Sequence, residues 1–403
     1  MDFNDTAQEA IFRGEACAWL ALNAPLVRDD TVSDLQWAKR WEKNKFDGGW
    51  SCIHWPKEYG GKNSTMVEQI IFTQEESQYA VLQNYPCFNF GQAMVAPVLM
   101  AYGTEEQKRR YLPKIASGEE VWCQLFSESC SGSDLAAMRT KAVKTKDNWI
   151  INGQKIWSSF AHYSDLGLMI ARTDASLPKH KGLSCFVVEM DAPGITLQPI
   201  RDMTGSADFN EELFTDLHVT DTQRLGDIGE GWKITVATLM NERASLRGRK
   251  RAEDVDLLLT LANQVKIDGE AAISNAAVRD KVADWWCKSS GLYYNGLRSL
   301  TAQSKGTDPG PEESIVKMVK QPMVQDIYAF CLELMEGHGA ITSSDGTIQK
   351  DIFHTEFMAS PGMRIAGGTD EILANIIADR VLHLPSDLRV DKWGPFNEIP
   401  SKF

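Results

Sequence analysis

The chain has 403 residues, 43% of them hydrophobic, and a formal net charge of −13. This length allows a large core spread over two or three domains and excludes a single small module. The acidic balance argues against a surface that binds nucleic acid or an anionic membrane, because either needs a cationic footprint. No stretch approaches the ~20 apolar residues that a membrane span requires.

From the amino terminus to about residue 120 the pattern predicts helices. Thr104 and Gln107 fit a capping box, in which the two residues satisfy each other's backbone donors. Tyr111, Leu112 and Ile115 follow at helical spacing. We therefore expect an amino-terminal helical domain over residues 1–120.

Residues 121–226 change to the pattern of short strands, separated by Gly, Pro, Asn and Asp turns. The predicted strands include residues 142–143, 149–151, 166–170, 183–188 and 213–217. Their spacing leaves no room for crossover helices, so we expect an antiparallel barrel or sandwich. We therefore expect a middle β domain over residues 121–226.

After Gly231 the helical period returns and lasts almost to the end, which predicts a carboxy-terminal helical domain over residues 227–403. The stretch from Gly306 to Pro311 interrupts it as a loop, with Pro311 suited to the first turn of the next helix. The pattern as a whole predicts an α+β fold in the order helices, sheet, helical bundle.

The cysteines and histidines give little sign of a metal site. The eight cysteines are scattered without a C-x-x-C pair, and no secretory leader precedes them. We therefore expect reduced thiols and a cytoplasmic protein. The seven histidines show neither H-x-x-x-H nor H-E-x-x-H spacing, so no metal is expected.

The segment from Trp122 to Trp157 carries the strongest functional signal. It places hydroxyls and a glycine within residues 127–134, and the Asn152–Gly153 pair predicts a hairpin turn that carries Trp157 onward. A large planar polar cofactor needs amides and hydroxyls at its ring edge and an aromatic on its face. The alternative is an ordinary polar turn beside a core tryptophan.

Several motifs extend this signal along the chain. Further motifs lie at residues 55–61, 102–118, 226–232, 239–243 and 367–372. Together with residues 122–157, the signature segment, they resemble the acyl-CoA dehydrogenases in order and spacing. These are flavoproteins with an amino-terminal helical domain, a middle β domain that binds flavin and acyl-CoA, and a carboxy-terminal four-helix bundle. Neither G-x-G-x-x-G after a strand nor G-x-x-x-x-G-K-[ST] is present, so FAD fits better than a nicotinamide or a nucleotide phosphate.

The resemblance assigns roles by motif position. It implies flavin contacts for Gln124, Phe126, Ser127, Gly132, Ser133, Trp157, Ser159, Thr369 and Glu371. It implies substrate contacts for Ser133, Arg243, Gly367 and Gly368. Family members commonly have Pro-Gly where this chain has Ser129–Cys130. We expect the loop to keep its path but with more freedom, since proline's fixed φ is missing.

Oxidation of an acyl thioester at its α,β bond needs a carboxylate to remove the α proton while hydride leaves the β carbon for the flavin. Many family members carry this base where the chain has Gly367, which cannot act as one. A second lineage carries the base on another helix, before an arginine, and there the chain has Glu242 before Arg243. Glu242 is therefore the candidate base, with an exposed or arginine-paired helix glutamate as the alternative.

The resemblance also bears on assembly. In family homotetramers a neighbouring subunit completes each flavin site with an arginine and a glutamine near the ADP half. This chain has Asp268 and Glu333 at those places. Carboxylates facing a pyrophosphate repel it by about a kcal/mol even in water. Either unlike subunits share the site, or a homo-oligomer binds a shifted ADP half.

The resemblance implies conversion of an acyl-CoA to the trans-2-enoyl-CoA, with electrons passed to an electron-transferring flavoprotein. Two alternatives remain: an oxidase-like activity that uses oxygen, and a non-catalytic or half-site subunit of a heteromeric enzyme. The acyl group, whether branched, long-chain or polycyclic, cannot be read from the sequence.

Overall fold

The computed structural model describes residues 5–79, 87–245, 253–304, 310, 314–340, 350–389 and 391–399. The chain forms two compact units. The first consists of Met1–Ile200, Ala207–Ser245 and Leu388–Phe403, and the second of Arg201–Ser206 and Leu246–Asp387. Within the described residues, no helix has the length and apolar character needed to cross a membrane.

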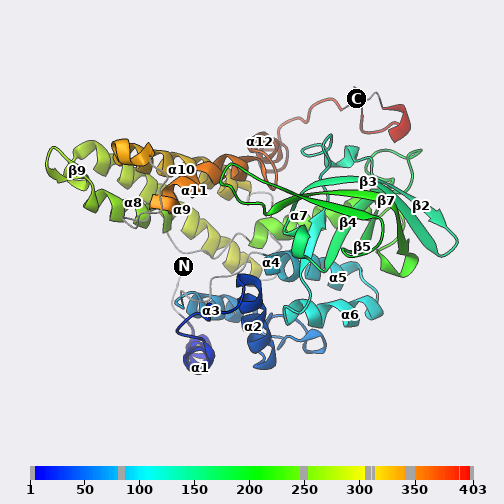
Figure 1. Ribbon diagram of the computed structural model, residues 1–403, viewed down its shortest axis with the longest axis horizontal. Coiled ribbons are helices and arrows are strands. Elements are labelled where there is room, and N and C mark those ends of the chain that lie inside the picture. Colours follow the sequence, from blue (N-terminus) through cyan, green and yellow to red (C-terminus); the bar gives the residue numbers. More distant parts are fainter. Residues whose placement is uncertain are drawn as a thin grey trace. The chain divides into compact units, whose positions relative to one another are not determined.

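The amino-terminal part of the first unit is helical, as predicted (Figure 1). Its α-helices are α1 (Ala7–Asn23), α2 (Asp34–Asp47), α3 (Met66–Glu76), α4 (Cys87–Asn89), α5 (Ala96–Tyr102) and α6 (Glu105–Ala116). The capping box before α6 is confirmed: Gln107 N donates to Thr104 Oγ1 (3.2 Å), and Thr104 N donates to Gln107 Oε1 (3.0 Å). These bonds satisfy two backbone amides at the amino-terminal end of the helix that have no acceptor within the helix.

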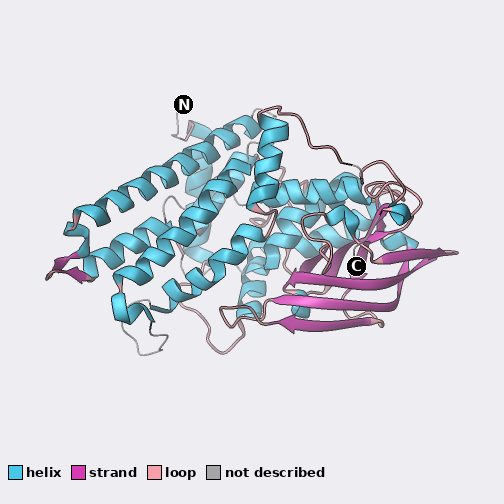
Figure 2. Ribbon diagram, turned by 90° about the horizontal axis from the view of Figure 1, so that it is seen from above, coloured by secondary structure: helices cyan, strands magenta, loops and turns pink. Residues whose placement is uncertain are grey.

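The same unit contains an eight-stranded sheet, drawn in magenta in Figure 2. Its strands are β1 (Trp122–Leu125), β2 (Lys141–Thr145), β3 (Asn148–Ser159), β4 (Leu166–Arg172), β5 (Leu183–Glu189), β6 (Ile195–Ile200), β7 (Phe209–Thr220) and β8 (Arg224–Leu225). The order is β6-β7-β3-β2-β4-β5-β8, with β1 beside β4. Every predicted strand is present.

The sheet is mainly antiparallel, but β1 pairs with β4 in parallel, Trp122 opposite Leu166 and Leu125 opposite Met169. A single further parallel bridge joins Lys141 to Arg172. The expected antiparallel sheet is therefore present, with the β1–β4 pairing as a parallel exception. The β2–β3 hairpin lies between β1 and β4 in sequence, and this long connection lets the chain re-enter beside β1 in the same direction.

The predicted hairpin turn at Asn152–Gly153 was also wrong. Both residues lie inside β3, at an irregularity where the register with β7 shifts between Ile151 and Gly153. Asn152 bonds Asp216 on β7 through both side-chain atoms, and a Cβ on Gly153 would come within 2.5 Å of Thr140. The glycine is thus required by a close approach at a bulge, not by a turn.

Helix α7 (Gly231–Ser245) follows the sheet in the first unit and packs on β4 and β5. Gly231 lies so near the Leu183–Ser184 peptide that a Cβ would come within 2.6 Å of its atoms. Thr235 and Thr238 are buried, and their hydroxyls donate to the carbonyls four residues earlier. Helix α7 is therefore anchored to the sheet along one face.

The second unit is a helical bundle, in which α8 (Glu253–Gln264), α9 (Ala276–Ser304), α10 (Ser314–Leu334) and α11 (Lys350–Ile365) pack around one apolar core (Figures 1 and 2). Ile327 and Cys331 of α10 and Leu258 of α8 are wholly buried there. A hairpin of β9 (Lys266–Ile267) and β10 (Glu270–Ala271) follows α8, and α12 (Asp370–Ile376) follows α11. Of the predicted loop from Gly306 to Pro311, only Gly310 is among the described residues.

Candidate functional site

The two halves of the signature segment lie side by side in the first unit. Phe126 and Ser127 continue from β1, and their carbonyls accept hydrogen bonds from Lys155 Nζ (2.8 Å) and Ile156 N (2.9 Å) of β3. Phe126 is buried, whereas Gln124 and Ser127 are half-buried. The linked spacing of the two motifs in the sequence thus corresponds to a direct backbone contact.

A buried ion pair holds the loop of residues 126–134, the signature loop, to β3. Lys155 Nζ lies 2.8 Å from Glu128 Oε1, and the Glu128 carboxylate also accepts the amides of Arg139 (2.6 Å) and Thr140 (2.9 Å). Burial lowers the pKa of Lys155, with Glu128 opposing the shift. For Glu128, burial acts to raise the pKa, but Lys155 and these donors outweigh it and the pKa falls below its usual value.

The turn through Ser129 and Cys130 forms without a proline. Glu128 N donates to Ser131 O (3.1 Å) and Ser131 N donates to Glu128 O (2.9 Å), which closes the turn through Ser129 and Cys130. All eight cysteines, Cys130 included, are free thiols. Two reciprocal backbone bonds therefore close this turn without a proline.

Gly132 and Ser133 form the exposed tip of the loop. Behind them, the Ser131 hydroxyl donates to the carbonyls of Asp134 (3.0 Å) and Leu135 (3.1 Å). The buried ammonium of Lys179 contacts both carboxylate oxygens of Asp134 at 2.8 Å. The tip is thus open to solvent but fixed at both ends, which suits recognition of a ligand by backbone amides.

Trp157 projects from a β-bulge. The β3–β7 register passes from Ile156 opposite Glu211 to Ser158 opposite Asn210, so Trp157 is the extra residue, and its φ is 64°. Its side chain is 55% exposed, with its ring edge-on to Phe209 at 5.9 Å between centroids. The alternative of a core tryptophan is therefore wrong. A left-handed tryptophan held outward by a bulge is a strained feature of the kind found at functional sites.

A carboxyl group that sequence reasoning missed lies beneath this bulge. Glu212 on β7 is fully buried and accepts a hydrogen bond from Ser158 Oγ (2.9 Å), while Asn210 Nδ2 donates to Ser158 O (2.9 Å). The second carboxylate oxygen of Glu212, Oε1, has no hydrogen-bond partner among the described residues. The signal was available, because Asn210, Glu212 and Phe214 share the inward parity of one strand.

Burial raises the pKa of Glu212 to about 8, and the Glu211 carboxylate adds to the shift, whereas Ser158 and Lys155 oppose it. A raised folded-state pKa means that the folded protein binds more protons than the unfolded chain between pH 4.5 and about 8. Protonation of Glu212 therefore stabilises the folded protein relative to the unfolded chain. This stabilisation is complete below pH 4.5 and is lost as the pH rises through about 8.

We therefore expect Glu212→Gln to gain stability relative to wild type as the pH rises from 5 to 8, by at most about 1.4 kcal/mol per pH unit. Urea unfolding at several pH values measures this difference. Glu189→Gln, on an exposed position of β5, is the control and should follow the wild-type profile. Parallel profiles for Glu212→Gln and wild type would show that Glu212 ionises normally.

In the second unit, the predicted carboxy-terminal motif forms the turn between α11 and α12. Gly367 and Gly368 have φ values of 61° and 97°, which only glycine adopts readily. Thr369 caps α12, its Oγ1 accepting the amide of Ile372 (3.2 Å), and Glu371 is exposed in the first helical turn. The buried Lys317 of α10 donates to the carbonyls of Ala366 and Gly368.

Two other predicted positions lie in the second unit. Asp268 occupies the tight turn between β9 and β10, with φ of 52°. Glu333 lines a hollow of about 450 Å³ on α9 and α10. The other charged groups of this hollow are Asp280, Lys281, Asp284, Lys288 and Asp326. Carboxylates outnumber ammonium groups there, so the hollow disfavours a pyrophosphate.

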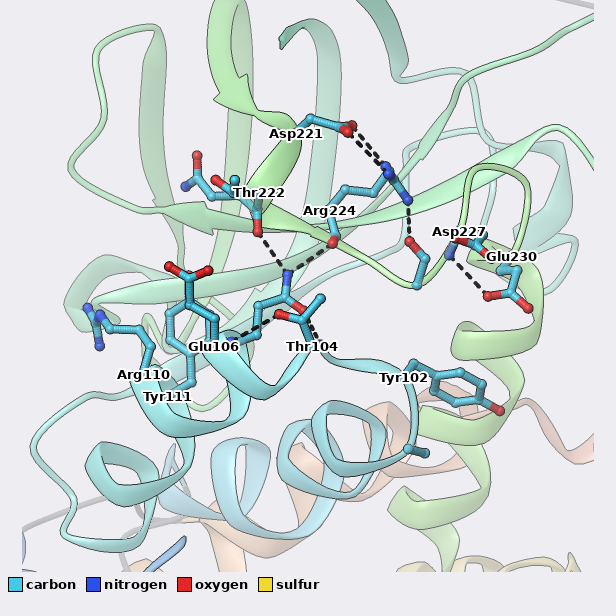
Figure 3. Close-up of a pocket in the computed structure, with 14 residues that line it drawn as sticks. Tyr102, Thr104, Glu106, Arg110, Tyr111, Asp221, Thr222, Arg224, Asp227 and Glu230 are labelled. Atoms are coloured by element: carbon cyan, nitrogen blue, oxygen red, sulfur yellow. Dashed lines mark hydrogen bonds and ion pairs between the residues drawn. The ribbon is translucent and has the colours of Figure 1, made fainter. Parts of the chain in front are cut away.

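Another cleft lies in the first unit. Figure 3 shows it between α6 and the segment after β7, with a volume of about 580 Å³. Gln107 Nε2 joins the two sides by donating to the carbonyls of Thr222 (2.9 Å) and Arg224 (3.0 Å). Arg224 in turn lowers the pKa of Asp221 to about 2. None of the described lining residues is a predicted site residue. We therefore interpret the cleft as part of the packing between α6 and the segment after β7.

Glu242 and Arg243 fall on α7, but their side chains lie outside the described part of the structure. The structure therefore gathers the predicted residues in two groups. One comprises residues 124–133 with Trp157 and Ser159 in the first unit, and the other comprises residues 367–371 in the second.

Comparison with known proteins decides the family. Residues 8–119, 123–222 and 229–382 match the N-terminal, middle and C-terminal domains of acyl-CoA dehydrogenases, respectively. The chain belongs to the acyl-CoA dehydrogenase family. The resemblance seen in the sequence is thereby confirmed, and with it the fold class and an oxidoreductase activity of this type.

Named relatives span the whole chain. Acyl-CoA dehydrogenase IpdE1 of Mycobacterium tuberculosis is 32% identical over 385 residues, which cover 93% of this chain and 94% of the relative. The solved ChsE4-ChsE5 complex of Mycobacterium tuberculosis has a TM-score of 0.81 at 27% identity, covering 96% of this chain and 100% of the matched one. The structure named Tcur3481-Tcur3483 steroid ACAD gives the same TM-score, identity and coverage.

Acyl-CoA dehydrogenases are FAD-dependent, so FAD is the cofactor of this protein. The residues in place suit such a group. An exposed indole offers a face for a planar ring, and the fixed, exposed tip at Gly132 and Ser133 offers amides and a hydroxyl. When bound, FAD supplies the acceptor for hydride.

Proposed function

We propose that this acyl-CoA dehydrogenase oxidises the α,β bond of an acyl-CoA thioester to the trans-2-enoyl-CoA, with Glu242 as the base for the α proton. The observation that carries the proposal is the loop of residues 126–128, which Lys155 fixes to β3 two residues before the outward-facing Trp157. A fixed loop beside an open aromatic face is what a dehydrogenase needs to hold its redox cofactor in one orientation.

The position of Glu242 on α7 supports its role. It follows Thr238 by four residues and Thr235 by seven, so the helical repeat places position 242 on the face that these buried threonines share. Gly367 carries no competing carboxylate, and its amide would donate to the thioester oxygen as enolate charge develops.

The proposed flavin contacts are those that the family resemblance assigns by motif position. Trp157 would cover one face of the flavin ring, and Gln124, Phe126, Ser127 and Ser159 would line its edge. Gly132 and Ser133 would contact the pyrophosphate and the substrate. Thr369 and Glu371 are further proposed flavin contacts, and Arg243, Gly367 and Gly368 are proposed substrate contacts.

Replacing Trp157 by Ala should shift the absorbance spectrum of bound flavin and weaken its retention, because a stacked aromatic face is lost. Gel filtration followed by absorbance spectroscopy measures both effects. Trp393, also largely exposed at 75%, is the matched control, and Trp393→Ala should leave both readouts at wild-type values. An unchanged spectrum and unchanged retention in Trp157→Ala would remove Trp157 from the cofactor site.

The proposed substrate carries a bulky polycyclic acyl group, and the proposed electron acceptor is an electron-transferring flavoprotein. The name of the related Tcur3481-Tcur3483 steroid ACAD supports the first point. An oxygen-using enzyme would instead form one peroxide per turnover, so peroxide release during the assay distinguishes a dehydrogenase from an oxidase.

We also propose that an unlike acyl-CoA dehydrogenase subunit completes the ADP half of the flavin site. The carboxylates at Asp268 and Glu333, and the acidic hollow around Glu333, support this assembly over a plain homotetramer. The ChsE4-ChsE5 relative is itself named as a complex of two differently named subunits.

The assembly proposal predicts that the chain alone holds less than one FAD per chain, because half of each site is missing or carries the wrong charge. Adding the partner should raise occupancy toward one FAD per heterodimer and stabilise the mixed oligomer. Sedimentation with detection at the flavin absorbance measures mass and occupancy together. A homo-oligomer with one tightly bound FAD per chain and no partner would contradict the heteromeric assembly while leaving Glu242 untouched.

A further inference from the structure

Lys317 of α10 is placed where it acts directly on the glycine turn of the second unit. Its side chain is buried, with only 7% of the residue exposed. Its ammonium donates to Ala366 O and, at 2.6 Å, to Gly368 O. These two carbonyls lie on either side of Gly367, the residue whose amide we assign to the thioester oxygen.

One of these carbonyls belongs to the same peptide group as the Gly367 amide. The peptide group is planar and trans, so the Ala366 C=O and the Gly367 N–H point in opposite directions. A cation fixed on that carbonyl oxygen therefore sets the direction of the N–H. It also draws electron density toward the oxygen, which strengthens the N–H as a donor.

Other contacts hold the ends of the turn rather than its carbonyls. Arg364, near the end of α11, bonds Asp370 of α12 at 2.7 Å and Gln325 of α10 at 3.0 Å. Thr369 caps α12 through the Ile372 amide. The backbone between these anchors contains two successive glycines with positive φ, which are free to adopt other conformations. Lys317 contacts this otherwise adaptable stretch at two points.

We propose that Lys317 is a positioning residue that orients and polarises the Gly367 amide toward the thioester oxygen. This inference rests on the proposed function, since it needs the thioester at Gly367. Charge on that oxygen grows between bound substrate and transition state, so the effect of Lys317 is larger on the chemical step than on binding.

The first test uses amide hydrogen exchange, read by mass spectrometry on peptides that span residues 364–372 of the full-length protein. Lys317→Met removes the charge at similar length, and we expect exchange in the turn to be roughly ten- to hundredfold faster than in wild type. Lys317→Arg keeps a cation and should stay nearer wild type. Lys288→Met, at a half-exposed ion pair on α9, controls for general loosening and should leave the turn unchanged.

The second test is anaerobic flavin reduction by an acyl-CoA in the flavin-loaded protein. We expect Lys317→Met to lower kcat roughly tenfold or more while KM changes little, with partial recovery in Lys317→Arg. If the wild-type protein oxidises the thioester, unchanged amide exchange in the turn or an unchanged kcat in Lys317→Met would overturn the inference. Wild-type protein that oxidises no thioester would instead overturn the proposed function, and the exchange result would still show whether Lys317 holds the turn.

Discussion

Glu242→Gln is expected to slow flavin reduction by an acyl-CoA by roughly 10²–10⁴, because loss of a positioned general base removes that much of the rate. The substitution keeps the size of the side chain, so flavin content should stay at the wild-type value. Stopped-flow absorbance under anaerobic conditions measures the rate of the chemical step directly.

Glu15→Gln is the matched control for that experiment, since Glu15 is an exposed residue on α1 and lies outside the proposed site. It should reduce flavin at the wild-type rate. If Glu242→Gln retains a tenth or more of the wild-type rate, the base is another residue.

Lys155→Met should destabilise the protein by about 3–5 kcal/mol, because it leaves the buried Glu128 carboxylate without its cation. Lys155 is fully buried, and it also holds the Phe126 carbonyl, so the signature loop should loosen and retain flavin less well. Urea unfolding followed by tryptophan fluorescence gives the free energy of unfolding.

The double variant Lys155→Met with Glu128→Gln should recover part of this loss, since the uncompensated charge is then removed as well. Lys43→Met is the control, because its pair with Asp47 is exposed on both sides and contributes about 0–1 kcal/mol. A free energy of unfolding for Lys155→Met within about 1 kcal/mol of wild type would mean that the buried pair does not secure the loop.

The parts of the fold that the sequence predicted are those set by local pattern. The change of period near residue 121, the capping box at Thr104 and the alternating strands of the sheet depend on residues close together in the chain. The turn through Ser129 and Cys130 is also local, because its closing bonds involve only the backbone of Glu128 and Ser131.

The failures depend on partners far away in sequence. Asn152–Gly153 has the composition of a hairpin turn, but Thr140 and Asp216 make it a bulge within β3. The parallel pairing of β1 with β4 also needs knowledge of the whole sheet order. Glu212 was missed because its burial beneath Trp157 follows from the β3–β7 register, although strand parity pointed inward.

The central claim is that this chain carries out flavin-dependent α,β-dehydrogenation of an acyl-CoA. The most direct test is an anaerobic titration of the flavin-loaded protein, with its partner subunit if occupancy requires one, by saturated acyl-CoA thioesters that include a steroid side-chain thioester. We expect the oxidised-flavin absorbance to disappear, with one enoyl-CoA formed per FAD reduced, as counted by mass spectrometry. Flavin that a chemical reductant bleaches but that no acyl-CoA thioester reduces would contradict the claim.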